Sequence, residues 1–173
     1  LIRSAQISDP SSKHNGSTRD LLIEKGEITQ IKAKIPVGKH QVVEGNGLHV
    51  SPGWVDMCAN FCDPGLEYKE DLHTGLAAAA RGGFTAVVSM PSTEPPVDTR
   101  SQVDYWIKQS QGKVTELLPA GTISKGLKGT QLSELHDMSK AGAVAFTDYK
   151  KPSKNPELLN RALEYSKGFG GTV

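Results

Sequence analysis

The sequence predicts an α/β fold in which a small sheet precedes parallel strands that alternate with helices. Short apolar runs separated by turn residues fill the first 50 positions. After them, apolar runs alternate four times with helical segments. Such alternation is typical of parallel strands covered by their connecting helices. We therefore expect two regions, residues 1–50 and residues 51–173.

The first region is predicted to form a small antiparallel sheet. A strand is expected over residues 1–7, followed by a polar loop over residues 9–17. Two apolar runs then flank Lys25-Gly26, where glycine permits the positive φ that a tight hairpin needs. A third run, residues 41–44, completes the expected sheet.

The second region is predicted to contain four strands, each followed by a helix. Proline at the first helical position, as in Asn155-Pro156, is tolerated there and opens the last helix. The expected strands cover residues 48–61, 84–90, 115–123 and 143–147, with the start of a fifth at 171–173. The expected helices cover residues 71–81, 101–111 with Ser101 as N-cap, 131–140 and the segment after Asn155. A doubly wound sheet and half of an eight-stranded barrel both satisfy this order.

Composition excludes several classes of protein. The 173 residues carry 20 Lys and Arg against 19 Asp and Glu, so no field of a single sign is available to bind nucleic acid or an anionic membrane. The longest apolar stretches, such as residues 76–80, are far shorter than the roughly 18 residues that span a bilayer. With two Cys and no secretory leader, a cytoplasmic protein is expected.

The most informative stretch runs from Ser51 to Gly75 and reads SPGWVDMCANFCDPGLEYKEDLHTG. It is followed by GGFT at residues 82–85 and MPSTEP at residues 90–95. In order and spacing, these motifs resemble the dihydroorotase branch of the metal-dependent amidohydrolases. The resemblance implies a (β/α)8 TIM barrel of the amidohydrolase type, with its first half in residues 51–173, and a small β-sandwich domain to which residues 1–50 contribute. A complete barrel needs about 250 residues.

The resemblance also implies where a site would lie. In the family, a His-x-His-x-Arg run at the end of the first barrel strand binds zinc and holds the substrate carboxylate. Cys58, Asn60 and Cys62 stand at the matching positions, and strand alternation would place them on one side. Ser92 replaces an Asn that holds the carboxylate, and Asp148 matches a metal-ligating Asp. The metal positions are thus 58, 60 and 148, the substrate positions are 62 and 92, and no catalytic residue is predicted.

Losing two imidazoles removes two strong zinc ligands, because a carboxamide oxygen binds zinc weakly. We therefore expect a dihydroorotase-like protein of pyrimidine biosynthesis that has lost hydrolysis, has weakened or lost zinc binding, and plays a structural or regulatory role. The expected partners are further copies of itself and aspartate carbamoyltransferase. Two alternatives stay open: an active cyclic amidohydrolase with an atypical metal site, and a free-standing βα binding module.

Simpler roles compete at each candidate position. The two Cys can be small buried apolar residues. Asn60 can be a hydrogen-bonded residue of a barrel interior. Asp148 can be a surface carboxylate paired with the neighbouring Lys150 or Lys151.

Overall fold

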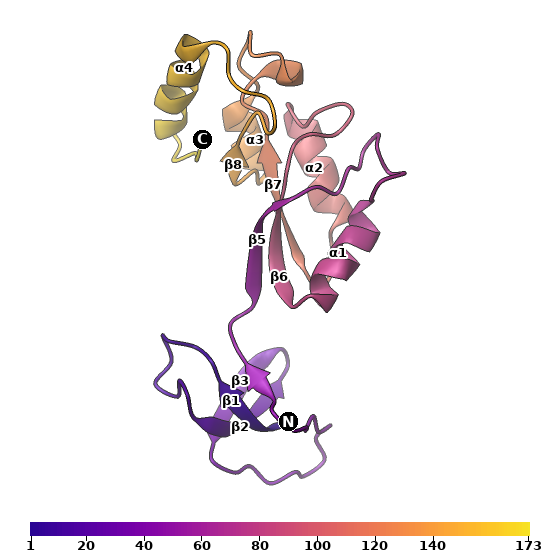
Figure 1. Ribbon diagram of the computed structural model, residues 1–173, viewed down its shortest axis with the longest axis vertical. Coiled ribbons are helices and arrows are strands. Elements are labelled where there is room, and N and C mark those ends of the chain that lie inside the picture. Colours follow the sequence, from indigo (N-terminus) through magenta and orange to yellow (C-terminus); the bar gives the residue numbers. More distant parts are fainter. The chain divides into compact units, whose positions relative to one another are not determined.

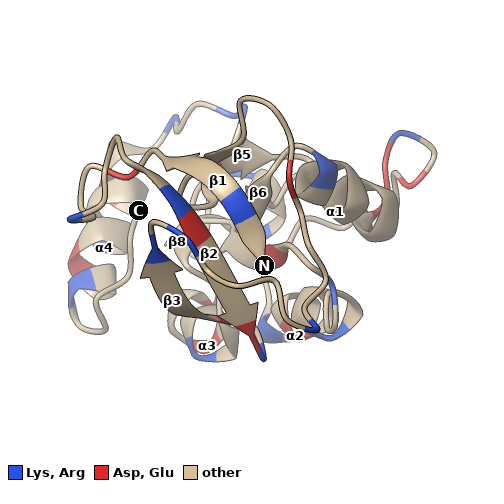
Figure 2. Ribbon diagram, turned by 90° about the horizontal axis from the view of Figure 1, so that it is seen from below, with Lys and Arg blue, Asp and Glu red and all other residues tan.

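The computed structural model describes residues 1–173, which divide into two units, Leu1–Pro52 and Gly53–Val173 (Figure 1). Each unit is built on one four-stranded sheet. Acidic and basic residues are interspersed along the elements of both units (Figure 2). None of the helices has the length and apolar character that a membrane span requires.

Unit 1 contains a sheet with strand order β3-β2-β1-β4. Its strands are β1 (Ile2–Ile7), β2 (Thr18–Glu24), β3 (Glu27–Lys32) and β4 (His49–Val50). The predicted hairpin is confirmed, since β2 and β3 are antiparallel and both Lys25 and Gly26 have positive φ. The expected strand over residues 41–44 is wrong, because only Val43 forms a bridge, to Ile2. Instead β4 pairs with β1 in parallel, so the sheet is mixed rather than antiparallel.

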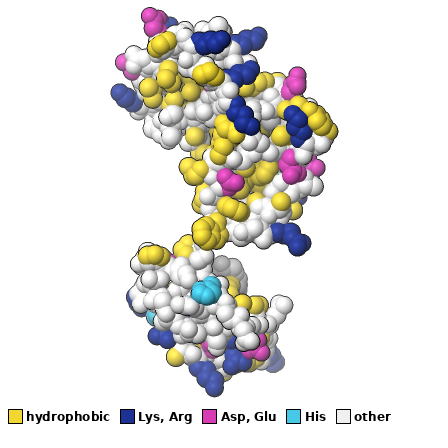
Figure 3. All heavy atoms as spheres, in the orientation of Figure 1, with side chains coloured by type: hydrophobic (Ala, Val, Ile, Leu, Met, Phe, Trp, Pro, Cys, Tyr) yellow, Lys and Arg dark blue, Asp and Glu magenta, His cyan; other side chains and the backbone are white.

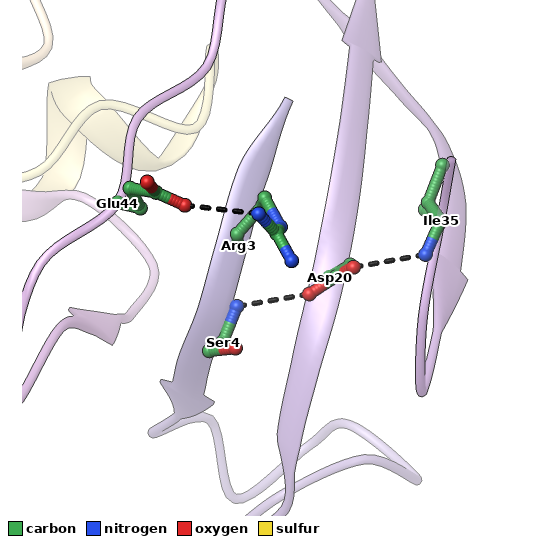
Figure 4. A network of polar contacts seen from close by, with 5 residues as sticks. All are labelled: Arg3, Ser4, Asp20, Ile35 and Glu44. Atoms are coloured by element: carbon green, nitrogen blue, oxygen red, sulfur yellow. Dashed lines mark hydrogen bonds and ion pairs between the residues drawn. The ribbon is translucent and has the colours of Figure 1, made fainter. Parts of the chain in front are cut away.

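A buried carboxylate holds unit 1 together (Figure 4). Asp20 on β2 is only 3% exposed, and its oxygens accept from the backbone N–H of Ser4 at 2.9 Å and of Ile35 at 2.8 Å. These two donors lower the pKa of the Asp20 carboxyl, because they stabilise its charged form. Nearby, Arg3 pairs with Glu44 at 3.1 Å. Asp20 therefore joins β2 to β1 and to the segment after β3.

Unit 2 alternates strands and helices along a parallel sheet of order β5-β6-β7-β8 (Figure 1). The strands are β5 (Trp54–Ala59), β6 (Phe84–Ser89), β7 (Glu116–Gly121) and β8 (Ala145–Phe146). The helices are α1 (Leu72–Arg81), α2 (Arg100–Gln109), the short 3-10 helix η1 (Lys125–Leu127), α3 (Leu135–Ala141) and α4 (Pro156–Lys167). Strands adjacent in sequence are adjacent in the sheet, without the order reversal of a doubly wound fold. The unit is therefore a parallel half-barrel.

Two predicted elements change because of proline and capping chemistry. The expected strand over residues 48–61 is two strands in different sheets, β4 and β5. They are separated at Pro52-Gly53, where proline has no N–H to continue a ladder. Helix α2 is capped by Thr99 rather than Ser101, since the Gln102 side chain accepts from the Thr99 N–H at 3.0 Å. This is the reciprocal pairing of a capping box.

Two further boundaries depend on contacts between distant segments. Helix α3 begins at Leu135, later than predicted, because residues 131–133 pair with the segment after β7. There the Ser133 N–H donates to the Ile123 carbonyl at 2.9 Å. Residues 171–173 form no fifth strand, although the Phe146 N–H donates to the Thr172 carbonyl at 2.9 Å.

The main core of unit 2 is an apolar cluster that includes residues from all four α-helices and the sheet, and a smaller cluster is formed by Val88, Met90 and Ala120. The fully buried members of the main core include Trp106, whose indole N–H donates to the Asp63 carbonyl at 2.6 Å. Because a buried indole combines large apolar area with a fixed hydrogen bond, Trp106 anchors the loop after β5. The main cluster comprises Phe61, Leu72, Leu76, Val87, Val97, Val103, Trp106, Leu117, Leu135, Met138, Ala143, Phe146 and Ala162.

Candidate functional site

The candidate residues lie at the carboxyl ends of three strands of unit 2. Cys58 is in β5, Asn60 and Cys62 follow it, Ser92 follows β6, and Asp148 follows β8. Because the strands are parallel, these ends share one edge of the sheet. Parallel barrels position their active sites at this edge.

Asn60 joins two other strand ends through its side chain. Its amide nitrogen donates to the Tyr149 hydroxyl at 3.2 Å, and its amide oxygen accepts from the Ser92 hydroxyl at 3.1 Å. The three half-buried residues follow β5, β6 and β8. Both ends of the Asn60 carboxamide are thus used in binding the strand ends to one another.

The two cysteines occupy different surroundings. Cys58 is exposed, whereas Cys62 is half-buried, with its sulfur 3.8 Å from the Asn60 carbonyl oxygen. The interpretation of Cys58 as a buried apolar residue is therefore wrong. Strand β5 ends at Ala59, and Cys62 has a φ of 59° in the left-handed region. The alternation expected to align positions 58, 60 and 62 therefore does not extend to Cys62.

Asp148 is hydrogen-bonded to the segment after β7 rather than paired with a lysine. One carboxylate oxygen accepts from the Ile123 and Ser124 N–H groups, both at 2.9 Å, and the other accepts from the Ser124 hydroxyl at 2.5 Å. No ion pair of the chain includes Asp148. The carboxylate therefore connects the end of β8 to the loop that leads into η1.

The loop after β5 is held by contacts that the sequence did not indicate. The Tyr105 hydroxyl donates to the Asp63 carboxylate at 2.9 Å. Burial and then this hydrogen bond raise the pKa of Tyr105 to about 12. The Glu94 N–H donates to the Pro64 carbonyl at 3.0 Å. This contact brings the loop at residues 63–65 against the loop at residues 92–95. A Cβ on Gly65 would lie 1.9 Å from the Glu94 carbonyl oxygen.

The residues that this chain supplies at the strand ends do not by themselves make a zinc site. No three side chains of His, Cys, Asp or Glu come together as a group that could hold a metal ion. The Asn60 carboxamide oxygen is a weak zinc ligand and accepts from Ser92, while both Asp148 oxygens accept hydrogen bonds. The side-chain oxygens of Asn60 and Asp148 are therefore used in hydrogen bonds within the fold.

Tyr149 is the member of this group that the sequence analysis missed. It follows Asp148 directly and is the acceptor for Asn60 across the sheet edge. The available signal was a large aromatic residue directly after the candidate ligand Asp148. Its partner lies 89 positions earlier in the sequence, too distant for a local pattern to indicate the pair.

Comparisons of the sequence with known proteins find one family over most of the chain. The dihydro-orotase-like family model matches residues 47–159. A dihydroorotase of Acetivibrio thermocellus is 44% identical over 170 residues, covering 98% of this chain and 40% of that protein. Dihydroorotases of Aquifex aeolicus and Geobacter sulfurreducens are 36% and 41% identical, each with 98% of this chain and 40% of the relative covered. The chain thus spans about two-fifths of the length of these curated relatives.

A solved structure shares the fold. The L-hydantoinase (dihydropyrimidinase) from Arthrobacter aurescens aligns with a TM-score of 0.78 at 22% sequence identity. The alignment covers 98% of this chain and 38% of the hydantoinase. At this identity the likeness concerns the fold alone, and it agrees with a half-barrel that is part of a larger TIM barrel.

Proposed function

The chain belongs to the dihydro-orotase-like family, and from that membership we propose that it is part of a protein of pyrimidine biosynthesis that has lost cyclic-amide hydrolysis. The protein retains the barrel scaffold and serves a structural or regulatory role. Residues 1–50 supply part of a β-sandwich, and residues 51–173 supply the first half of the barrel.

The observation that carries this proposal is the use of the candidate ligands within the fold. The Asn60 carboxamide is hydrogen-bonded to Tyr149 and Ser92. The Asp148 carboxylate is hydrogen-bonded to Ile123 and Ser124. A metal at the strand ends would have to compete with these partners for oxygen atoms. With no imidazole at positions 58 and 60, such a metal would also be held by few strong ligands.

Substrate contacts are altered in the same region. In the family, the residues at positions 62 and 92 would hold the substrate carboxylate. In this chain these residues are Cys62 and Ser92. A cysteine side chain cannot make the bidentate, charge-assisted contact that a guanidinium makes with a carboxylate. The Ser92 hydroxyl donates a hydrogen bond to the Asn60 amide oxygen instead. The proposal therefore includes loss of substrate recognition as well as of metal binding.

The second candidate function is an active cyclic amidohydrolase with an atypical metal site. Asp148 favours it, because it lies two residues after the end of β8, at the sheet edge where active sites form. In that case a single metal would be held by Asp148 and by residues outside this chain. Fewer ligands would bind the metal more weakly, and bound water would be acidified less than in a complete site.

Metal content and hydrolysis separate the two candidates. We expect purified protein to contain well under one zinc per chain by mass spectrometry and to leave dihydroorotate unhydrolysed when zinc is supplied. Stoichiometric zinc together with hydrolysis would establish the second candidate instead. The readout of metal content does not depend on which substrate is offered.

A restored variant tests whether these positions are the cause. Cys58→His combined with Asn60→His should raise zinc binding above that of the original protein, because two imidazole ligands return to the strand end. The matched control is Met57→His, which adds an imidazole at a neighbouring position that is 72% exposed. Equal zinc binding by the double variant, the control and the original protein would contradict the reasoning.

Assembly is a further part of the proposal. We propose that the protein associates with copies of itself and with aspartate carbamoyltransferase. Trp54 and Met57 on β5 are 63% and 72% exposed, so this strand presents apolar surface that a partner or the rest of the barrel can cover. Hydrophobic side chains are visible on the surface of both units (Figure 3). Light scattering of the protein alone and mixed with aspartate carbamoyltransferase measures both. This part would be contradicted if the protein alone had the mass of a monomer and the mixture contained only the separate proteins, with no larger complex.

A further inference from the structure

Two adjoining cavities border the loop that follows β8. The first has a volume of about 410 Å³ and extends from this loop to α4. The second, of about 340 Å³, extends from the same loop to the end of η1. Asp148, Lys151, Pro152 and Ser153 line both. Together they reach the size range of small-molecule sites, about 300–1,000 Å³.

Lysines dominate the charge of these cavities. Lys150 and Lys151 line the first, while Lys128, Lys151 and Lys154 line the second. Asp148 is the only carboxylate in either lining, and none of the three ion pairs of the chain uses any of these lysines. The cavities therefore carry a local positive excess although the net charge of the chain is only +1.

Asp148 is poorly placed to neutralise this charge. Its carboxylate accepts from two N–H groups and one hydroxyl of the segment after β7. Turning toward a lysine would break these bonds and release the loop that leads to η1. The lysines are thus left without an acidic partner from their own lining.

The start of the loop that carries the lysines contacts the strand ends through Tyr149. The Lys150 ammonium lies 5.0 Å from the centre of the Tyr149 ring, within the range of a cation–π contact. Tyr149 is in turn held by Asn60. Lys154 directly precedes Asn155, the N-cap of α4, and the positive end of this helix adds to the field.

We propose that these cavities bind a small anion that carries phosphate groups. Lysine ammonium groups act as point charges that suit phosphate oxygens in many directions, whereas carboxylates are matched best by the planar fork of arginine. No arginine lines either cavity. The site goes beyond the proposed function, because it requires neither a metal nor hydrolysis.

Isothermal titration with inorganic pyrophosphate at constant ionic strength tests the site. We expect saturable binding that weakens about tenfold or more in Lys151→Ala, since a hydrogen bond to a charged group is worth this much. The matched control is Lys113→Ala, which removes the same charge from the exposed turn before β7, and it should change the affinity less than twofold. Citrate, a tricarboxylate whose charge near neutral pH is close to that of pyrophosphate, should bind more weakly than pyrophosphate.

Three results would overturn the proposal: no saturable binding, equal weakening by the Lys151 and Lys113 variants, or citrate binding as tightly as pyrophosphate. The circular dichroism spectrum of each variant checks folding. If Lys151→Ala is unfolded, Lys128→Ala takes its place, because Lys128 lines only the second cavity and is exposed. Metal content is measured separately, so failure here leaves the proposed loss of hydrolysis unaffected.

Discussion

Gly65 is the position where the motif loops approach most closely, and Gly65→Ala should destabilise unit 2. The residue has a φ of 91°, and an added Cβ would lie 1.9 Å from the Glu94 carbonyl oxygen and 2.8 Å from its carbon. Both are backbone atoms, so no side chain can turn aside. The two loops would have to separate, with loss of the 3.0 Å bond from the Glu94 N–H to the Pro64 carbonyl.

The magnitude has two contributions. A left-handed backbone costs a residue with a Cβ about 1–2 kcal/mol, and the lost hydrogen bond costs about 0.5–1.5 kcal/mol. We expect the free energy of unfolding to fall by about 1.5–3.5 kcal/mol. Urea denaturation followed by tryptophan fluorescence measures it, because Trp106 is fully buried and bonded to Asp63 of the same loop.

Gly112→Ala is the matched control. Gly112 has a φ of 74° in the same unit, but no atom lies within 4 Å of the position of its Cβ. This variant should therefore lose only the contribution of the backbone conformation. If the two variants lower the free energy of unfolding equally, the close approach to Glu94 does not stabilise the loops and the reasoning is refuted.

Two predictions concern pH. Because the pKa of Asp20 is lowered from 3.8, the stability that it contributes is fully present above that value and is lost as pH falls through the native pKa. Asp20→Asn should flatten the acid unfolding curve measured by circular dichroism, and an unchanged curve would contradict this. Because the pKa of Tyr105 is raised from 10.0 to about 12, its contribution is present below pH 10 and is lost as pH rises through 12. Phenolate absorbance should show one late-titrating tyrosine that Tyr105→Phe removes.

Local chemistry explains the elements that were predicted well. The hairpin at Lys25-Gly26 forms because glycine accepts a positive φ, and α4 begins at Pro156 after the Asn155 cap. Each of these signals acts within a few residues. By contrast, β4 is found beside β1 through pairing across more than 40 positions, which no local pattern specifies.

At the candidate site, too, the residue types follow from the sequence, whereas their contacts depend on distant segments. The sequence by itself indicated the family, the order of strands and helices, and the replacement of both imidazoles by Cys58 and Asn60, because these follow from residue identity and spacing. Only the tertiary structure decided that Asn60 bonds Tyr149 and that Asp148 bonds Ser124. The physical reason is that a parallel sheet brings the ends of distant strands to one edge. A side chain at that edge forms a hydrogen bond with the donor or acceptor that the neighbouring loop presents.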